Sequence, residues 1–114
     1  MSLIDLIRKK QHSTRKTLEV TEWSGEDEAP FIVYFGKFLA HDLDRLQRKH
    51  PNFINNVTIA GMVDMIIMKA QDRDGNMLFT LEDKPTLMRE PVEVITKIAG
   101  EMMTANSFED HEKN

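Results

Sequence analysis

The segment Ala70–Arg89, AQDRDGNMLFTLEDKPTLMR, constrains the fold of this chain more than any other. Its DRDGN stretch consists largely of turn-forming residues, and Gly75 takes a positive φ at little cost. The apolar run 77–79 follows as a predicted buried anchor, and Thr80 with Asp83 three residues later predicts a helix N-cap. The segment therefore predicts helix, tight turn, buried anchor and helix, and it offers no catalytic group.

Composition indicates a soluble globular chain. One domain is expected for 114 residues, of which 40% are hydrophobic and 30% charged. The absence of cysteine excludes disulfides and thiolate chemistry and suits a reducing compartment. The apolar runs are far shorter than the roughly 20 residues that span a bilayer, and the N-terminus lacks the residue order of a secretory signal. We therefore expect a cytoplasmic protein that does not bind membranes.

Charge is unevenly distributed along the chain. Residues 1–16 carry five basic residues against Asp5, a net charge of +4, whereas the remaining residues carry −8. A general nucleic-acid binder usually has a basic face across the whole domain, so this pattern argues against one. A short basic arm on an acidic body is suited to contacts with acidic surfaces, including another copy of the chain.

The N-terminal third predicts an arm followed by a β-hairpin. Residues 3–10 are expected to form a short amphipathic helix and 11–16 a polar linker, which together make a basic arm over 1–16. Alternation from Thr17 to Trp23, and then the apolar run 31–35, predict two strands joined by an acidic loop. We expect the second strand to be buried on both faces. Helices or a partner subunit must cover this ribbon, because an isolated two-stranded hairpin is marginal in water.

Helical spacing of apolar residues dominates the rest of the chain, so the predicted fold is α+β, mainly α-helical, with three to five helices. Three further helices are expected at 59–71, near 81–89 and at about 91–104, after a helical segment that ends at Pro51. The predicted globular domain spans 17–104, and residues 105–114 form a flexible polar tail. Helix 59–71 is clearly interrupted only by Asp64 and Lys69, so it is either the central core helix or half-exposed to a partner.

No pattern in the chain indicates catalysis or a cofactor. An EF-hand loop with Gly75 at its sixth position would place Ala70 and Leu81 where two essential ligands belong, so DRDGN is interpreted as a turn. His41 with Asp42 and Asp44 is interpreted as a solvated polar face rather than a metal site. The chain has no metal-ligand spacing of histidines, no nucleotide-binding motif and no GxSxG. We predict no catalytic residue, no metal and no cofactor.

Methionine is concentrated in the predicted helices. Its unbranched, polarisable side chain lets a surface repack around varied apolar helices, and the alternative is simple core filling. The residues concerned are Met62, Met65, Met68, Met77, Met88, Met102 and Met103. The apolar character of helix 59–71 favours an exposed apolar face for part of this set.

The order of these elements resembles a known family. A strand ends in Trp-Ser-Gly-Glu (23–26), an aromatic strand follows, and a helix runs into KAQDRDGNMLFTLED (69–83) before a final helix with Val94, Ile95 and Ile98. Over residues 15–104 this pattern resembles the tail assembly chaperones of long-tailed lambdoid bacteriophages. The stretch from Lys69 to Asp83 is its distinctive part.

The resemblance implies a protein of the host cell cytoplasm that binds other proteins and is not an enzyme. Such chaperones keep the long helical tape measure protein soluble and recruit tail tube protein, and weak helix-in-groove contacts along one chain add by avidity. The implied surfaces are helices 59–71 and 91–104 and the hairpin aromatics, and homo-oligomers are expected. The candidate binding residues are Trp23, Phe31, Tyr34, Phe35, Met62, Met65, Met68 and Met102. The alternative is a small nucleic-acid-binding regulator that uses the basic arm.

Overall fold

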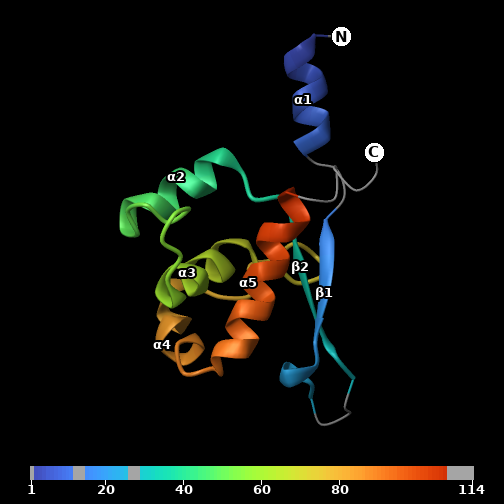
Figure 1. Cartoon of the computed structure of the whole chain (residues 1–114). Coiled ribbons are helices and arrows are strands. Elements are labelled where there is room, and N and C mark those ends of the chain that lie inside the picture. The colour runs from blue at the N-terminus through green and yellow to red at the C-terminus, as the bar shows by residue number, and fades with distance from the viewer. Residues whose placement is uncertain (1, 12–14, 26–28, 108–114) are drawn as a thin grey trace.

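The computed structural model of the chain describes residues 2–11, 15–25 and 29–107. In chain order the elements are α1 (Leu3–Gln11), β1 (Lys16–Val20), the 3₁₀ helix η1 (Thr21–Trp23), β2 (Phe31–Phe35), α2 (Ala40–Lys49), α3 (Ile59–Lys69), the 3₁₀ helix η2 (Leu81–Asp83), α4 (Lys84–Leu87) and α5 (Val92–Ser107). Figure 1 shows the body built from the hairpin, α3 and α5, with α1 extending away from it. The predicted α+β fold, mainly helical with an N-terminal hairpin, is confirmed.

The hairpin pairs β1 and β2 in antiparallel register, with Leu18 opposite Val33 and Val20 opposite Phe31. It is extended on its β2 side, because Tyr34 and Gln71 exchange backbone hydrogen bonds of 2.9 and 2.8 Å. The segment after α3 therefore adds one antiparallel β-bridge to the edge of the two-stranded sheet. This pairing reduces the exposed edge of a ribbon that would be marginal alone.

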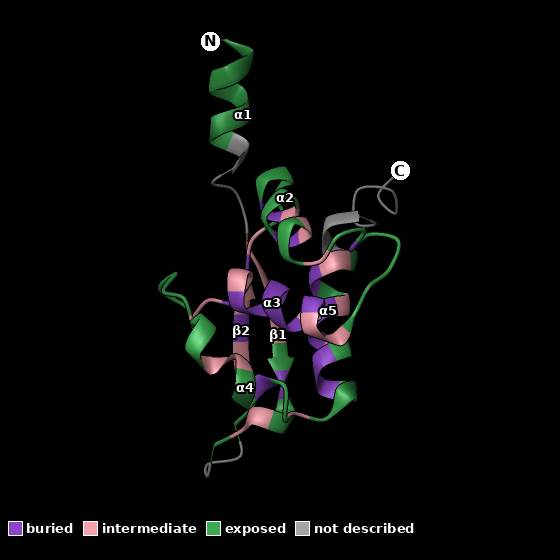
Figure 2. Ribbon diagram, turned by 90° about the vertical axis from the view of Figure 1, so that its left-hand side faces the viewer, coloured by how far each residue is buried: buried purple, intermediate pink, exposed green. Residues whose placement is uncertain are grey.

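Two helices form the centre of the core. Contacts between α3 and α5 are the most extensive of any helix pair, and α5 also covers β1. Figure 2 shows buried residues concentrated on α3, α5 and the inner side of the hairpin. On α3 the residues Val63, Met65 and Ile66 are completely buried. Of the two interpretations of helix 59–71, the structure supports the central core helix.

Several predicted boundaries need correction. The first strand ends at Val20, because η1 already occupies residues 21–23. β2 is buried mainly on one face, that of Val33 and Phe35, and is only half-covered on the other. The last helix reaches Ser107, beyond the predicted end at 104. The remaining predicted tail, 108–114, and half of the predicted linker, 12–14, lie outside the described residues.

The turn at 72–76 has the conformation that its residues predict. Gly75 has φ of 89°, and the Asp72 carboxylate accepts hydrogen bonds from the backbone N–H groups of Asp74 and Asn76, at 2.8 and 2.9 Å. These backbone hydrogen bonds, that from Asn76 above all, lower the pKa of Asp72. The predicted anchor is only partly correct, because Met77 is exposed and only the next two residues pack against the core.

Two predictions for the segment after the turn are confirmed. The Thr80 hydroxyl accepts a hydrogen bond from the N–H of Glu82, and Asp83 accepts one from the N–H of Thr80, so the N-cap is reciprocal. The short predicted helix follows as η2 and α4. In the described part of the chain, no helix is both long and apolar enough to cross a membrane.

Candidate functional site

The eight side chains predicted to bind a partner do not form one surface. Phe35, Met65 and Met102 are buried in the core, so they cannot contribute to a surface of the folded chain. Met62 and Met68 are half-buried and pack against the same core. The physical reason is that α3 needs apolar side chains nearly all round, since the hairpin, α2, α4 and α5 surround it. For the fully buried methionines, core filling is the correct alternative.

The predicted hairpin aromatic Tyr34 supports the base of the N-terminal arm. The Arg15 guanidinium lies 4.9 Å from the centre of the Tyr34 ring, a cation–π contact. Its nitrogens also donate to the side-chain oxygen of Gln71 and to the backbone carbonyls of Asp72 and Arg73, at 3.2, 3.0 and 2.7 Å. The last residue before β1 is therefore fixed to β2, to Gln71 and to the turn that follows Gln71.

Trp23 brings together three segments that are distant in sequence. Its indole N–H donates to the Glu90 carboxylate at 2.6 Å, which joins η1 to the loop before α5. Its ring packs edge-on against Phe79, at 5.8 Å between centroids, and against Phe31, at 6.4 Å. Such aromatic pairs stabilise beyond their burial by roughly 0.5–1.5 kcal/mol each.

Exposed apolar side chains lie on the same segments that Trp23 joins. Leu81 and Val92 are 63% and 61% exposed, and Phe31 and Met88 are also exposed. We call the apolar residues of these segments the Trp23 corner and define it as Trp23, Phe31, Phe79, Leu81, Met88 and Val92. The predicted binding set contained only Trp23 and Phe31 from this surface. The available signal was the position of Leu81 and Val92, because each is the first residue of a helix.

The N-terminal arm carries a second exposed apolar surface. Leu3, Ile4, Leu6 and Ile7 on α1 are exposed by fractions that range from 71% at Leu3 to 42% at Ile7. The predicted amphipathic helix is confirmed, and Figure 2 shows its described side chains exposed along its length. Burial of such side chains on association is favourable by about 1.5–3 kcal/mol each when complete.

A buried carboxylate that the sequence did not reveal joins three helices. Asp64 on α3 is only 3% exposed, and its Oδ2 atom lies 2.6 Å from His50 Nε2 and 3.0 Å from Lys84 Nζ. Lys49 Nζ is 3.8 Å away. Its other oxygen, Oδ1, is buried without a protein hydrogen-bond partner among the described residues. Burial raises the pKa of Asp64, but the hydrogen bonds from His50 and Lys84 and the nearby lysine charges outweigh it, so the pKa is lowered overall.

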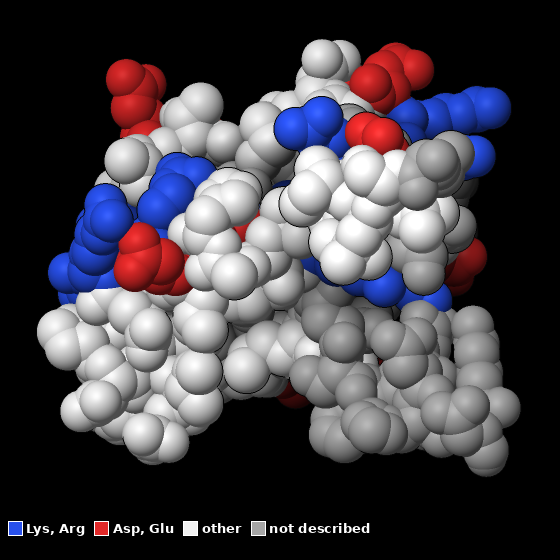
Figure 3. All heavy atoms as spheres, turned by 90° about the horizontal axis from the view of Figure 1, so that it is seen from above, with Lys and Arg blue, Asp and Glu red and all other residues white. Residues whose placement is uncertain are grey.

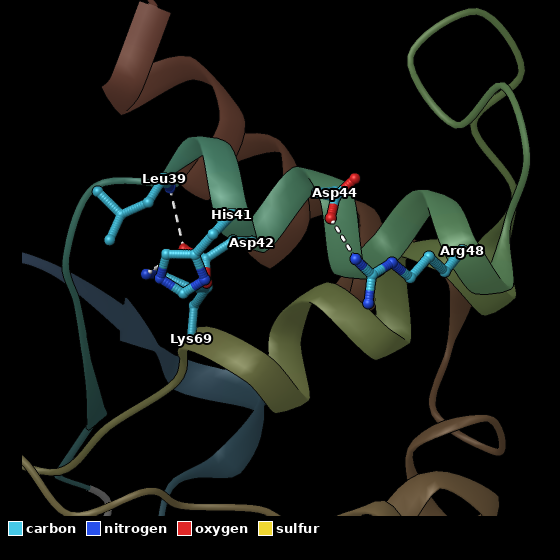
Figure 4. A network of polar contacts seen from close by, with 6 residues as sticks. All are labelled: Leu39, His41, Asp42, Asp44, Arg48 and Lys69. Carbon is cyan, nitrogen blue, oxygen red and sulfur yellow. Dashed lines mark hydrogen bonds and ion pairs between the residues drawn. The ribbon is translucent and has the colours of Figure 1, made fainter.

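A second ion pair joins the other ends of α2 and α3. The Asp42 carboxylate accepts hydrogen bonds from the backbone N–H of Leu39, at 2.9 Å, and from Lys69 Nζ, at 2.8 Å. Figure 4 shows Asp42 pointing from the start of α2 toward Lys69 at the end of α3, with the exposed pair Asp44 and Arg48 further along α2. The two interruptions of the apolar pattern of α3, Asp64 and Lys69, are thus the two residues that pair with α2.

These polar groups serve to hold helices together. Among the described residues, no three acidic or histidine side chains gather in a set that could hold a metal ion. On the face that Figure 3 shows, basic side chains lie in separate groups with acidic side chains beside them.

Comparison with protein-family models, with curated proteins and with solved structures finds no match to this chain.

Proposed function

We propose that this chain is a tail assembly chaperone of the kind that its sequence resembles. It is a non-enzymatic protein that binds the helical tape measure protein of a long-tailed phage in the host cytoplasm. The observation that carries the proposal is the Trp23 corner, an apolar surface on the outside of the fold. The residues 69–83 that carry the resemblance also lead into this surface, because they end in η2.

The corner has the properties of a helix-binding surface. Its centre, Trp23, is fixed by the Glu90 hydrogen bond and two aromatic contacts, so little side-chain entropy is lost on binding. Around it, Leu81 and Val92 offer apolar area at the starts of two helices. Such a surface suits the apolar stripe of an amphipathic helix, and the tape measure protein presents many such stripes along one chain.

Chaperone action follows from repeated weak binding. Each contact covers one apolar stripe that would otherwise cause aggregation, and several copies along one tape measure chain add by avidity. Tail tube protein then displaces the chaperone as it polymerises around the tape measure protein. In this proposal the fully buried methionines of α3 and α5 stabilise the fold, and the corner replaces them as the partner surface.

Co-expression with a tape measure fragment tests the proposal. We expect the wild-type chain to raise the soluble fraction of the fragment and to co-purify with it. The variant Leu81→Asp with Val92→Asp should lose both effects while keeping the fold, because both side chains are exposed and acidic residues are favourable at helix starts. Ile54→Asp is the matched control, since Ile54 is 61% exposed but lies between α2 and α3, outside the corner.

Three results would contradict the proposal. No gain in fragment solubility with wild-type chain would remove the chaperone function, and unchanged binding by the corner variant would remove the assigned surface. Retention of DNA or RNA that falls steeply with salt and disappears without residues 1–16 would instead support the nucleic-acid-binding alternative.

A further inference from the structure

We propose that helix α1 of one copy of this chain docks on the Trp23 corner of a second copy. The inference shares with the proposed function the premise that the corner binds an amphipathic helix. It does not depend on the identity of any external partner, and purified protein alone can test it.

Helix α1 is an amphipathic helix that is already formed, which is the kind of ligand that the Trp23 corner is proposed to bind. Its first turn is closed by reciprocal contacts, in which the N–H of Asp5 donates to the Ser2 hydroxyl at 3.2 Å and that hydroxyl donates to the Asp5 carboxylate at 2.9 Å. Leu3, Leu6 and Ile7 fall on one side of the helix, with Ile4 beside them, and all four remain exposed. Because the helix exists before docking, association does not have to offset the full loss of conformational entropy that forming the helix costs.

Charge on α1 complements charge around the corner. Arg8 and Lys9 border the apolar stripe of α1 on its two sides, and Lys10 follows. Residues 21–23 and 81–97, which hold most of the corner, carry five acidic residues against three basic ones, Lys84, Arg89 and Lys97. Lys97 pairs with Glu22 and Lys84 with Asp64, so outside these pairs four acidic residues remain against Arg89. The acidic residues are Glu22, Glu82, Asp83, Glu90 and Glu93. An apolar helix with a basic end therefore meets an apolar surface with an acidic border.

The arrangement of the fold favours docking between copies over docking within one chain. The arm joins the body at Arg15, which is fixed to Tyr34 and to the turn after Gln71. Trp23, the centre of the corner, lies beyond the other end of β1. Figures 1 and 2 agree that α1 and α4 lie at opposite ends of the molecule. The apolar stripe of α1 is therefore presented to a neighbouring molecule rather than to its own corner.

The interface is formed by two different surfaces, and this permits a decisive mixing experiment. The arm variant carries Leu6→Asp and Ile7→Asp, and the corner variant carries Leu81→Asp and Val92→Asp, both in the full-length chain. All four side chains are exposed, so both variants should fold normally. Analytical ultracentrifugation over a wide concentration range measures self-association. Emission from Trp23, the single tryptophan of the chain, reports on the corner directly.

We expect weak, concentration-dependent self-association of the wild-type chain, because a single short helix buries less area than a standard interface. Each variant alone should associate at least about 100-fold more weakly, since two apolar anchors are lost. An equimolar mixture should form a heterodimer, because the corner variant supplies an intact arm and the arm variant an intact corner. Trp23 emission should change on mixing, and Ile54→Asp should behave as the wild-type chain does.

Other results would overturn the inference. A wild-type chain that stays monomeric at all concentrations means that α1 docks on its own body or remains unbound. Variants that associate as tightly as wild type place the interface elsewhere. A corner variant that associates as tightly as wild type beside a monomeric arm variant indicates pairing of α1 with α1. Failure of the mixture to associate, with both variants monomeric, rules out docking of the arm of one copy on the corner of another. None of these results bears on tape measure binding, which the co-expression experiment measures separately.

Discussion

At the scale of single residues, a glycine makes room for a buried aromatic ring in the core. Gly61 lies in the first turn of α3, where the Thr58 hydroxyl accepts a hydrogen bond from its N–H at 3.0 Å. The buried ring of Phe53 lies directly over it, so that a Cβ atom built on Gly61 would be 2.6 Å from a ring carbon. A glycine inside a helix is unfavourable by itself, and here it provides the space that Phe53 occupies.

Gly61→Ala should therefore destabilise the fold, although alanine is the better helix former. We expect the free energy of unfolding to fall by roughly 1–3 kcal/mol, the usual cost of overpacking a core. Gly100→Ala in α5 is the matched control, because nothing lies within 4 Å of its added Cβ. That substitution should stabilise by about 0.5–1 kcal/mol. Urea denaturation measures both changes, and equal effects of the two substitutions would contradict the packing argument.

At the scale of elements, the sequence predicted the structure correctly where a pattern of residues is compatible with only one backbone conformation. Turn residues around Gly75 and the cap at Thr80 specify local backbone, so both were predictable. The alternation of apolar and polar residues in β1 and the apolar run in β2 identified the hairpin. They did not predict that β1 would end at Val20 and that η1 would begin at residue 21. The reason is that Trp23 is held by Glu90, a residue that lies distant in sequence and close only in the fold.

The role of apolar residues was less predictable than their positions. A methionine in the core and one on a surface have the same side chain, so Met65 could not be assigned before α5 and the hairpin were placed around it. Asp64 shows the reverse problem, since a charge in an apolar helix suggests a solvent-facing position. It is buried because Lys49 of α2 and Lys84 of α4 reach it.

Removal of the Asp64 charge should loosen the packing of α2 and α4 on α3. At neutral pH, Asp64→Asn should lower the free energy of unfolding by roughly 2–3 kcal/mol. This is below the usual cost of breaking a fully buried pair, because His50 and Lys84 are partly exposed. Asp44→Asn removes an exposed pair with Arg48 and should change the free energy by less than about 0.5 kcal/mol.

The effect of Asp64 should also depend on pH in a defined direction. The folded state lowers the pKa of this carboxyl below its ordinary value of 3.8, so its contribution is complete above that value. The contribution is lost as pH falls through the lowered pKa of the folded state. The difference between wild type and Asp64→Asn in urea denaturation should therefore shrink below pH 3.8. A difference that stays constant down to strongly acidic pH would contradict an ionised Asp64 in the fold.

At the scale of the whole molecule, the exposed apolar side chains of α1 stand apart from the core that stabilises the fold. The core draws on the hairpin, α2, α3, α4 and α5, whereas the described side chains of α1 are exposed. The arm is joined to the body through Arg15, which makes three hydrogen bonds and one ring contact. This division lets an apolar arm engage other molecules without unfolding the body that carries it.

Deletion of residues 2–11 should therefore leave the stability of the body unchanged. We expect the free energy of unfolding at low protein concentration to change by less than about 0.5 kcal/mol, because the described side chains of this segment, 2–9, are all exposed. Arg15→Ala should instead cost about 1–2 kcal/mol, because it breaks the contacts with Tyr34 and the turn. The deletion should also remove any rise of the melting temperature with concentration, since only a self-associating chain shows one. A large loss of stability on deletion at low concentration would mean that α1 packs against its own body.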